Sequence, residues 1–278
     1  TPYTFTYYEN DIKENDLVLV VTQSGLSTNA IEALKIIKKK ECRAICLTGN
    51  KNSDVKDVAD VVIEYGVGEE LVGYVTKGVS SLALFLDLFA IAYSGKTEYL
   101  DELKKAADLN EEMIDQATNF IQKHYKNFSS MSWVYSCGAG ANYGTALESA
   151  LKMGETIHIP SCCYEIEEYI HGPNLQLSPK HNVFIIDAQD ETSDRSYQIY
   201  RASRAVSDRV YYITNKAYND DHVLTLLNPC ADTVSLTYLQ VFQLFAYRIS
   251  KELRSIPKHP LFEEFKKIVN SKTITYED

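Results

Sequence analysis

The chain is poor in cysteine, histidine and basic residues, and each shortage excludes a class of protein. Six cysteines in 278 residues are too few for a disulfide scaffold, and Cys42 and Cys46 lack partners at the spacing of zinc ligands. The six histidines form no metal-binding pattern either, so we expect neither a metal nor another cofactor. The cysteines are expected to be reduced thiols of a cytoplasmic protein.

Lysine and arginine number 28 against 38 aspartates and glutamates, which gives a net charge of -10. This balance excludes the broad basic surface of a nucleic-acid-binding protein, although a few oriented dipoles can still bind a local anion. Long hydrophobic runs are also missing, since the most apolar stretch, residues 82–92, is too short to span a bilayer and contains Asp87. We therefore expect a buried helix there, and no signal peptide, membrane partner or nucleic acid.

A continuous apolar run, residues 17–21, is typical of a strand buried in a parallel sheet. A loop follows it, before the amphipathic helix of residues 30–39, and carries a glycine and four hydroxyl side chains: Thr22, Ser24, Ser27 and Thr28. Backbone amides and the helix dipole at such a helix N-terminus favour an anion such as phosphate. The alternative is ordinary capping, in which Ser27 or Thr28 only caps the helix.

Residues 131–173 read as a strand, a glycine-rich turn and a helix, followed by a second short helix. Glu148, Lys152 and Glu155 are spaced so that they share one face of the first helix, and His171 ends the second. Together they could supply a base, an ammonium group and an imidazole around one turn. The alternative is a surface Glu148–Lys152 pair, worth only about 0.2–0.5 kcal/mol, and a histidine that merely ends a helix.

Strand-like runs recur in the same order in the two halves. VLVVTQSG in the first half corresponds to VFIIDAQD in the second, and RAICLTGN corresponds to RVYYITNK. Repeated strand–helix order predicts an α/β protein with two doubly wound, flavodoxin-like parallel sheets, in domains 1–110 and 111–278. The first-half partner of the strand at 131–136 would precede residue 1, so we expect the first domain to lack its N-terminal strand and helix. The alternative is a rearranged first half. Asp190 and Glu191 take the place of the hydroxyl loop in the second half and would repel phosphate, which leaves one anion site.

Four motifs, in this order, resemble those of the sugar isomerase (SIS) domain family. TQSGLST resembles the loop that binds the sugar phosphate, and ALESALKMGE, EEYIHGP and KTITYE resemble three further family motifs. The resemblance covers nearly the whole chain as two SIS domains in tandem. It is closest to the isomerase domain of glucosamine-6-phosphate synthase and to fructosamine-6-phosphate deglycases.

This resemblance implies a role for each matched residue. Glu155 would move a proton between C1 and C2 of the sugar, with Lys152 beside it. His171 would open the sugar ring from the neighbouring subunit, which requires a homodimer, and Lys272 in the C-terminal tail would fold over the substrate. The resemblance implies that the phosphate contacts are Thr22, Gln23, Ser24 and Ser27. It implies further substrate contacts at Glu70, Val75 and Glu168.

Two positions depart from the family pattern: Val75 stands where a serine usually helps to bind the ligand, and Gly154 replaces a lysine. The resemblance predicts a phosphosugar isomerase or deglycase that acts on an amino-sugar 6-phosphate, of the fructosamine or glucosamine type, by metal-free proton shuttling. The alternative is a non-catalytic regulatory SIS protein that binds a sugar phosphate. The presence of Glu155, His171 and Lys272 together favours the enzyme.

Overall fold

The computed structural model describes residues 1–71, 74–226, 230–252 and 261–273. The chain forms two compact units, Thr1–Leu86 with Pro257–Asp278, and Asp87–Ile256. These units divide the chain inside a helix and group the C-terminal segment with the first unit. The compact units therefore differ from the predicted domains 1–110 and 111–278. The division into these two family domains stays a prediction.

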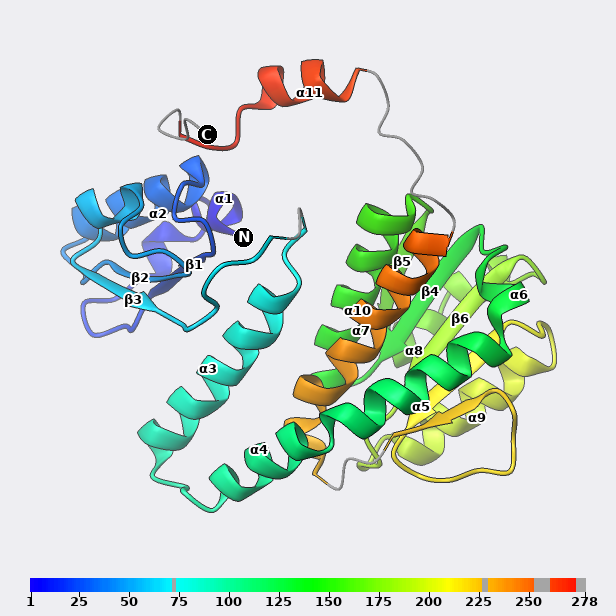
Figure 1. Ribbon diagram of the computed structural model, residues 1–278. Helices are drawn as coiled ribbons and strands as arrows, with labels where there is room; N and C mark the ends of the chain where they lie inside the picture. Colours follow the sequence, from blue (N-terminus) through cyan, green and yellow to red (C-terminus); the bar gives the residue numbers. More distant parts are fainter. Residues whose placement is uncertain (72–73, 227–229, 253–260, 274–278) are drawn as a thin grey trace. The chain divides into compact units, whose positions relative to one another are not determined.

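The first unit is built on a parallel three-stranded sheet in the order β1-β2-β3 (Figure 1). Apolar side chains of the second helix pack on one face of this sheet, and the first half of the third helix packs on the other. The elements of this unit are α1 (Pro2–Phe5), η1 (Glu9–Asp11), β1 (Leu19–Thr22), α2 (Thr28–Lys39), β2 (Ile45–Thr48), η2 (Asp54–Asp57), β3 (Val61–Glu64), the start of α3 (Lys77–Ser94) and α11 (Phe262–Val269).

The second unit has a parallel five-stranded sheet in the order β5-β4-β6-β7-β8. In chain order this is 2-1-3-4-5, the flavodoxin-like arrangement predicted from the repeat. Its strands are β4 (Trp133–Gly138), β5 (Ser161–Glu165), β6 (His181–Ile186), β7 (Val210–Thr214) and β8 (Val223–Thr225). Its helices after α3 are α4 (Tyr99–Asp108), α5 (Asn110–Lys123), α6 (Tyr125–Phe128), α7 (Ala141–Lys152), η3 (Met153–Ile157), α8 (Ile166–Ile170), η4 (Pro173–Gln176), α9 (Ser193–Arg204), η5 (Ala231–Thr233) and α10 (Val234–Glu252).

Side chains of the five-stranded sheet alternate between two apolar cores, as the two-residue period of a strand requires. Phe184 and Tyr211 face the core that contains α5, α7 and α10. Their neighbours Val183 and Tyr212 face the core that contains α8 and α9. Both faces are covered by helices, so β6 and β7 are buried along their whole length and the doubly wound prediction is confirmed (Figure 1).

The predicted repeat is visible in the topology, because β1, β2 and β3 follow one another as β6, β7 and β8 do. Within the described residues, the first sheet contains no strand equivalent to β4 or β5.

Helix α3 corrects one prediction. The stretch 82–92 lies in a longer helix, Lys77–Ser94, and only 11% of that helix is buried, so the expected buried helix is wrong. Its first half packs on the first sheet through Leu82 and Phe85, whereas Leu88 and Phe89 are exposed. Among the described helices it alone is long and apolar enough to cross a membrane by length and composition, which is weak evidence.

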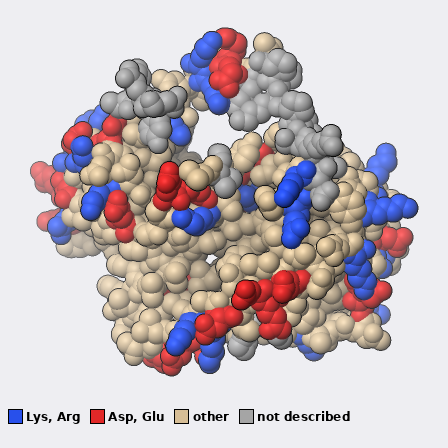
Figure 2. Space-filling model, viewed as in Figure 1, with Lys and Arg blue, Asp and Glu red and all other residues tan. Residues whose placement is uncertain are grey.

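Charged side chains are unevenly distributed on the face drawn in Figure 2. Acidic side chains form a band over α4 and α5, the helices that carry Asp101, Glu102, Glu111 and Glu112, and few charges lie over α3 (Figure 2). Basic side chains of the described residues are scattered rather than gathered on this face, and they form no basic patch for a polyanion there (Figure 2).

Candidate functional site

The hydroxyl loop after β1 lines a pocket of about 780 Å³ in the first unit. The turns after β2 and β3 and the C-terminal tail complete its wall. The Thr22 hydroxyl donates to Ser27 Oγ at 3.3 Å, and Ser24 Oγ accepts from the Leu26 amide at 3.3 Å. The hydroxyl protons of Ser24 and Ser27 are therefore still available to a ligand.

Ser27 occupies the N-cap position of α2, yet its side chain makes no capping hydrogen bond. The alternative in which Ser27 serves only as a helix cap is therefore wrong. Its hydroxyl instead lies in the wall of the pocket.

The C-terminal tail returns to this loop. Ser27 and Lys272 form an antiparallel bridge, the Thr28 amide donates to Ser271 O at 3.2 Å, and the Thr273 amide donates to Leu26 O at 2.9 Å. These backbone bonds bring Lys272, from the far end of the sequence, into the pocket wall. An ammonium beside donor hydroxyls is suited to an anionic ligand.

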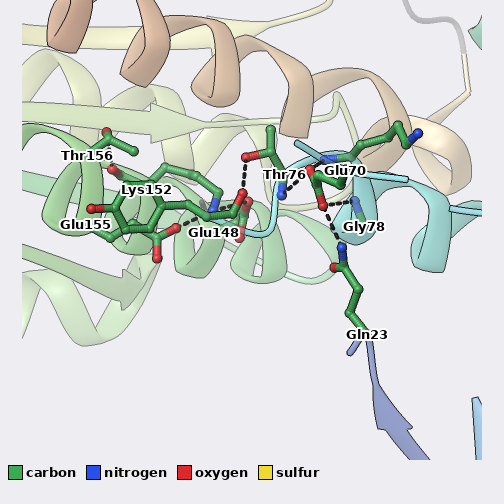
Figure 3. A network of polar contacts seen from close by, with 10 residues as sticks. Gln23, Glu70, Thr76, Gly78, Glu148, Lys152, Glu155 and Thr156 are labelled. Carbon is green, nitrogen blue, oxygen red and sulfur yellow. Dashed lines mark hydrogen bonds and ion pairs between the residues drawn. The ribbon is translucent and has the colours of Figure 1, made fainter. Parts of the chain in front are cut away.

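Gln23 and Glu70, both predicted as ligand contacts, bind each other. Gln23 Nε2 donates to the Glu70 carboxylate at 2.7 Å (Figure 3). The same carboxylate accepts the backbone amides of Thr76, Lys77 and Gly78 at 2.9, 2.5 and 3.2 Å. Glu70 thus occupies the N-terminus of α3, where a phosphate could otherwise bind, and links that helix to the loop after β1.

The environment of Glu70 keeps its carboxylate ionised. Burial alone would raise the pKa of Glu70, but the hydrogen bonds from Gln23 and from the amides of Thr76, Lys77 and Gly78 outweigh it and hold the pKa below its usual value. We interpret Glu70 as a residue that positions Gln23 and the loop, since the carboxylate itself is engaged with the protein.

Replacing Gly78 with alanine is expected to disrupt this arrangement. A Cβ at this position would lie 1.9 Å from Gln23 Oε1, and Gln23 can move away only by giving up its bond to Glu70. We expect a loss of roughly 1–3 kcal/mol in the free energy of unfolding and weaker phosphate binding, measured by urea denaturation and by titration. Gly144→Ala is the control, because nothing lies within 4 Å of its Cβ; equal behaviour of the two variants would contradict the role of Gly78.

The second unit contains a buried charged cluster at the end of α7. The Lys152 side chain is 2% exposed and Glu148 is 7% exposed. Lys152 Nζ lies 3.7 Å from Glu148 Oε1 and is paired with the Glu155 carboxylate, which is 24% exposed (Figure 3). The pair is therefore not the weak surface pair of the alternative. A buried ammonium group is strongly destabilising unless carboxylates neutralise its charge.

Glu155 lies in η3, a π-helical turn that directly follows α7. Such turns change the direction of a side chain relative to a continued α-helix and are frequent at functional sites. The turn brings Glu155 onto Lys152, and Glu155 is the most exposed carboxylate of the cluster. It is therefore the one that a substrate can reach.

Glu148 lies beside Lys152, as its i, i+4 spacing predicts. Burial raises the pKa of Glu148. The charge of Lys152 and a hydrogen bond to Gln243 lower it, whereas the nearby charge of Glu155 raises it further. Glu148 is a buried counter-charge for Lys152, and Glu155 competes with it for the same ammonium.

Three predicted residues remain: Val75 in the first unit, and His171 and Glu168 in the second. Val75 lines the pocket of the first unit. His171 is the exposed C-cap of α8, and Glu168, one turn earlier, is exposed as well. Among the described residues, neither side chain forms a hydrogen bond or ion pair with Lys152 or Glu155, so the contribution of His171 across a dimer stays a prediction. The described residues also contain no group of three or more metal-ligating side chains.

The family model of the SIS domain matches residues 4–92 and 128–249, which together make up most of the chain. The chain belongs to the SIS domain family. The two matched segments coincide with the two parallel sheets, so the resemblance read from the motifs is confirmed at the level of family and fold.

Several relatives and solved structures are similar to this SIS protein. A glutamine–fructose-6-phosphate aminotransferase [isomerizing] of Thermotoga maritima is 26% identical over 261 residues, which cover 88% of this chain and 43% of the relative. A candidate phosphosugar isomerase from Clostridium difficile has a TM-score of 0.86 at 26% identity, covering 99% of this chain and 81% of that one. The C-terminal domain of a glucosamine-fructose-6-phosphate aminotransferase from Francisella tularensis, at 20% identity and a TM-score of 0.79, covers 91% of this chain and 76% of its own and shares the fold.

The chain spans only 33–43% of the length of the curated relatives that it matches. The likeness therefore concerns their SIS portion, and the activity of those longer proteins is not carried over with it.

Proposed function

We propose that this SIS protein is a phosphosugar isomerase or deglycase that acts on an amino-sugar 6-phosphate. The observation that supports this most is the Glu155 carboxylate, which is accessible and is paired with the buried ammonium of Lys152. This arrangement leaves a carboxylate open to a substrate and places a cation beside it. Similarity to phosphosugar isomerases supports the same class of reaction.

In this proposal the phosphate binds in the pocket of the first unit. The hydroxyls of Ser24 and Ser27 and the ammonium of Lys272 would donate to its oxygens, and the N-terminus of α2 would add its dipole. Gln23 would contribute indirectly, because its amide is held by Glu70. The phosphate would thereby anchor the sugar in the pocket.

The chemistry would then be a proton transfer between neighbouring carbons. His171 from a second copy of the chain would open the sugar ring, and Glu155 would take the proton from one carbon and return it to the other through an enediol or enamine. Lys152 and Lys272 are the cations that could offset negative charge that develops on the oxygen. Hydrolysis of the enamine by water would release the amine, which is the deglycase outcome.

One observation favours a second candidate function, a regulatory protein that binds a sugar phosphate without turnover. The residues that line the pocket, among them the loop and Lys272, all belong to the first unit, so this pocket is built without the charged cluster of the second. We also propose a cytoplasmic location, supported by the six cysteines, all within the described residues and none in a disulfide.

Proton NMR in D₂O separates these functions. We expect a panel of fructosamine and hexosamine 6-phosphates to show exchange or loss of the C1 or C2 proton with one member. Released amine would identify a deglycase, and a new sugar without released amine an isomerase. Line broadening from binding, with no exchange for any member, would instead establish the regulatory function.

The double substitution Ser24→Ala with Ser27→Ala is expected to raise KM for the sugar phosphate by roughly 10–100-fold, because two charge-assisted hydrogen bonds are lost. The value of kcat should change little, since neither hydroxyl takes part in proton transfer. Steady-state kinetics measure both constants. Thr192→Ala with Ser193→Ala, at the start of α9, is the matched control. An unchanged KM for the first variant would mean that the phosphate binds elsewhere.

A further inference from the structure

The phosphate pocket contains more negative charge than a site for phosphate alone requires. Its described lining holds one basic side chain, Lys272, and two acidic ones, Glu69 and Glu70. A carboxylate close to a bound phosphate repels it, so an acidic residue in such a wall weakens binding unless the ligand also carries a positive charge.

The two carboxylates differ in what they already bind. Glu70 accepts three backbone amides and the amide of Gln23, so the protein itself neutralises its charge. Glu69 is exposed, and among the described residues its carboxylate makes no hydrogen bond or ion pair. Glu69 is therefore the carboxylate that a ligand can engage.

The backbone of Glu69 is held in place even though its side chain is not. Lys77 Nζ donates to the backbone carbonyl of Glu69 at 2.9 Å. Lys77 thus binds the main chain of the strand-to-helix connection and leaves the carboxylate to the ligand. Because the backbone is anchored, binding of a cationic group has to order only the side-chain rotamers of Glu69.

We propose that Glu69 is a specificity-determining residue that binds the ammonium group of a zwitterionic sugar phosphate. The pocket would then bind phosphate through Ser24, Ser27 and Lys272 and the amine through Glu69. Sugar phosphates without an amine would be disfavoured by the same carboxylate. This inference rests on the proposed function, since it assigns a charge requirement to the substrate of that pocket.

Isothermal titration with a matched pair of ligands tests this. Glucosamine 6-phosphate and glucose 6-phosphate differ only in the amine or hydroxyl at C2. We expect the full chain to bind glucosamine 6-phosphate more tightly, and Glu69→Gln to weaken that binding by about 5- to 10-fold. The same variant should bind glucose 6-phosphate equally well or more tightly, because a repulsive charge is gone.

Glu14→Gln is the matched control, since it removes the same charge from an exposed position of the same unit outside the pocket. It should leave both affinities unchanged. Equal affinities for the two ligands, or a Glu69→Gln variant that weakens both, would overturn the role of Glu69.

The titration also separates this inference from the proposed function. Preferential binding of the amine that depends on Glu69, without turnover, would support the inference and reject catalysis. Turnover of a sugar phosphate with no dependence on Glu69 would reject the inference alone. Failure of the wild-type chain to bind either ligand would reject both.

Discussion

Replacing Glu155 with glutamine is expected to lower kcat by roughly 10²–10⁴-fold, the usual contribution of a general base. Glutamine keeps the size of the side chain but cannot accept the proton from carbon. Binding of the sugar phosphate should remain nearly intact, because the phosphate loop lies in the other unit of the chain. Steady-state kinetics combined with titration of the ligand measure the two effects separately.

Two features make this variant interpretable. Glu148 remains beside Lys152 as a counter-charge, so the buried ammonium keeps one carboxylate and the fold should be retained. Glu167→Gln is the matched control, because Glu167 is a half-exposed carboxylate of the same unit that binds Arg195 instead. If Glu155→Gln lost binding and turnover together, or kept full turnover, Glu155 would not be the base.

Replacing Lys152 with methionine is expected to reduce the free energy of unfolding by about 3–5 kcal/mol at neutral pH, since it leaves buried carboxylates without their cation. Lys152 is 2% exposed and contacts both Glu148 and Glu155. Methionine retains most of the apolar volume, so the loss reports mainly the missing charge. Urea denaturation at several pH values measures it.

The loss of unfolding free energy in Lys152→Met should depend on pH. Burial already raises the pKa of Glu148 in the folded protein above the usual 4.5, and removal of Lys152 takes away an interaction that lowers it. A carboxyl with a raised folded-state pKa binds protons more readily when folded, so its destabilisation is present at high pH and is relieved as the pH falls through the folded-state pKa. The Lys152→Met variant should therefore lose less stability near pH 5 than near pH 8.

Lys123→Met is the control for this experiment. Lys123 is half exposed and pairs with Asp221 at the surface, so its removal should change the free energy of unfolding by less than about 1 kcal/mol. If the two variants lost the same amount of unfolding free energy, or if the loss in Lys152→Met were independent of pH, the buried carboxylates would not be the cause of the destabilisation.

Much of the fold could be predicted from the sequence because its central strands are continuous apolar runs. The strand-like run RVYYITNK contains β7, Val210–Thr214, and the repeat correctly indicated that both halves are parallel sheets. Strand β8 was missed, because an edge strand of three residues carries too short a pattern. Helix α9 was missed as well, since its sequence is predominantly polar.

The sequence by itself determined those parts of the site that consecutive residues build. A strand, a hydroxyl-rich loop and a helix follow one another at residues 19–39, so their order alone predicts an anion site. Likewise, the i, i+4 spacing of Glu148 and Lys152 predicts their contact on any helix.

Only the tertiary structure decided which of these charges are buried, engaged or open to a ligand. Lys152 is buried where α10 packs against α7, and the packing partners of α7 come from a segment about ninety residues later in the chain. Glu70 is engaged because three amides at the start of α3 and the amide of Gln23 converge on its carboxylate, whereas no described residue pairs with the carboxylate of its neighbour Glu69. Burial and the sharing of hydrogen bonds depend on residues that are distant in sequence, which is why local spacing could not separate these acids.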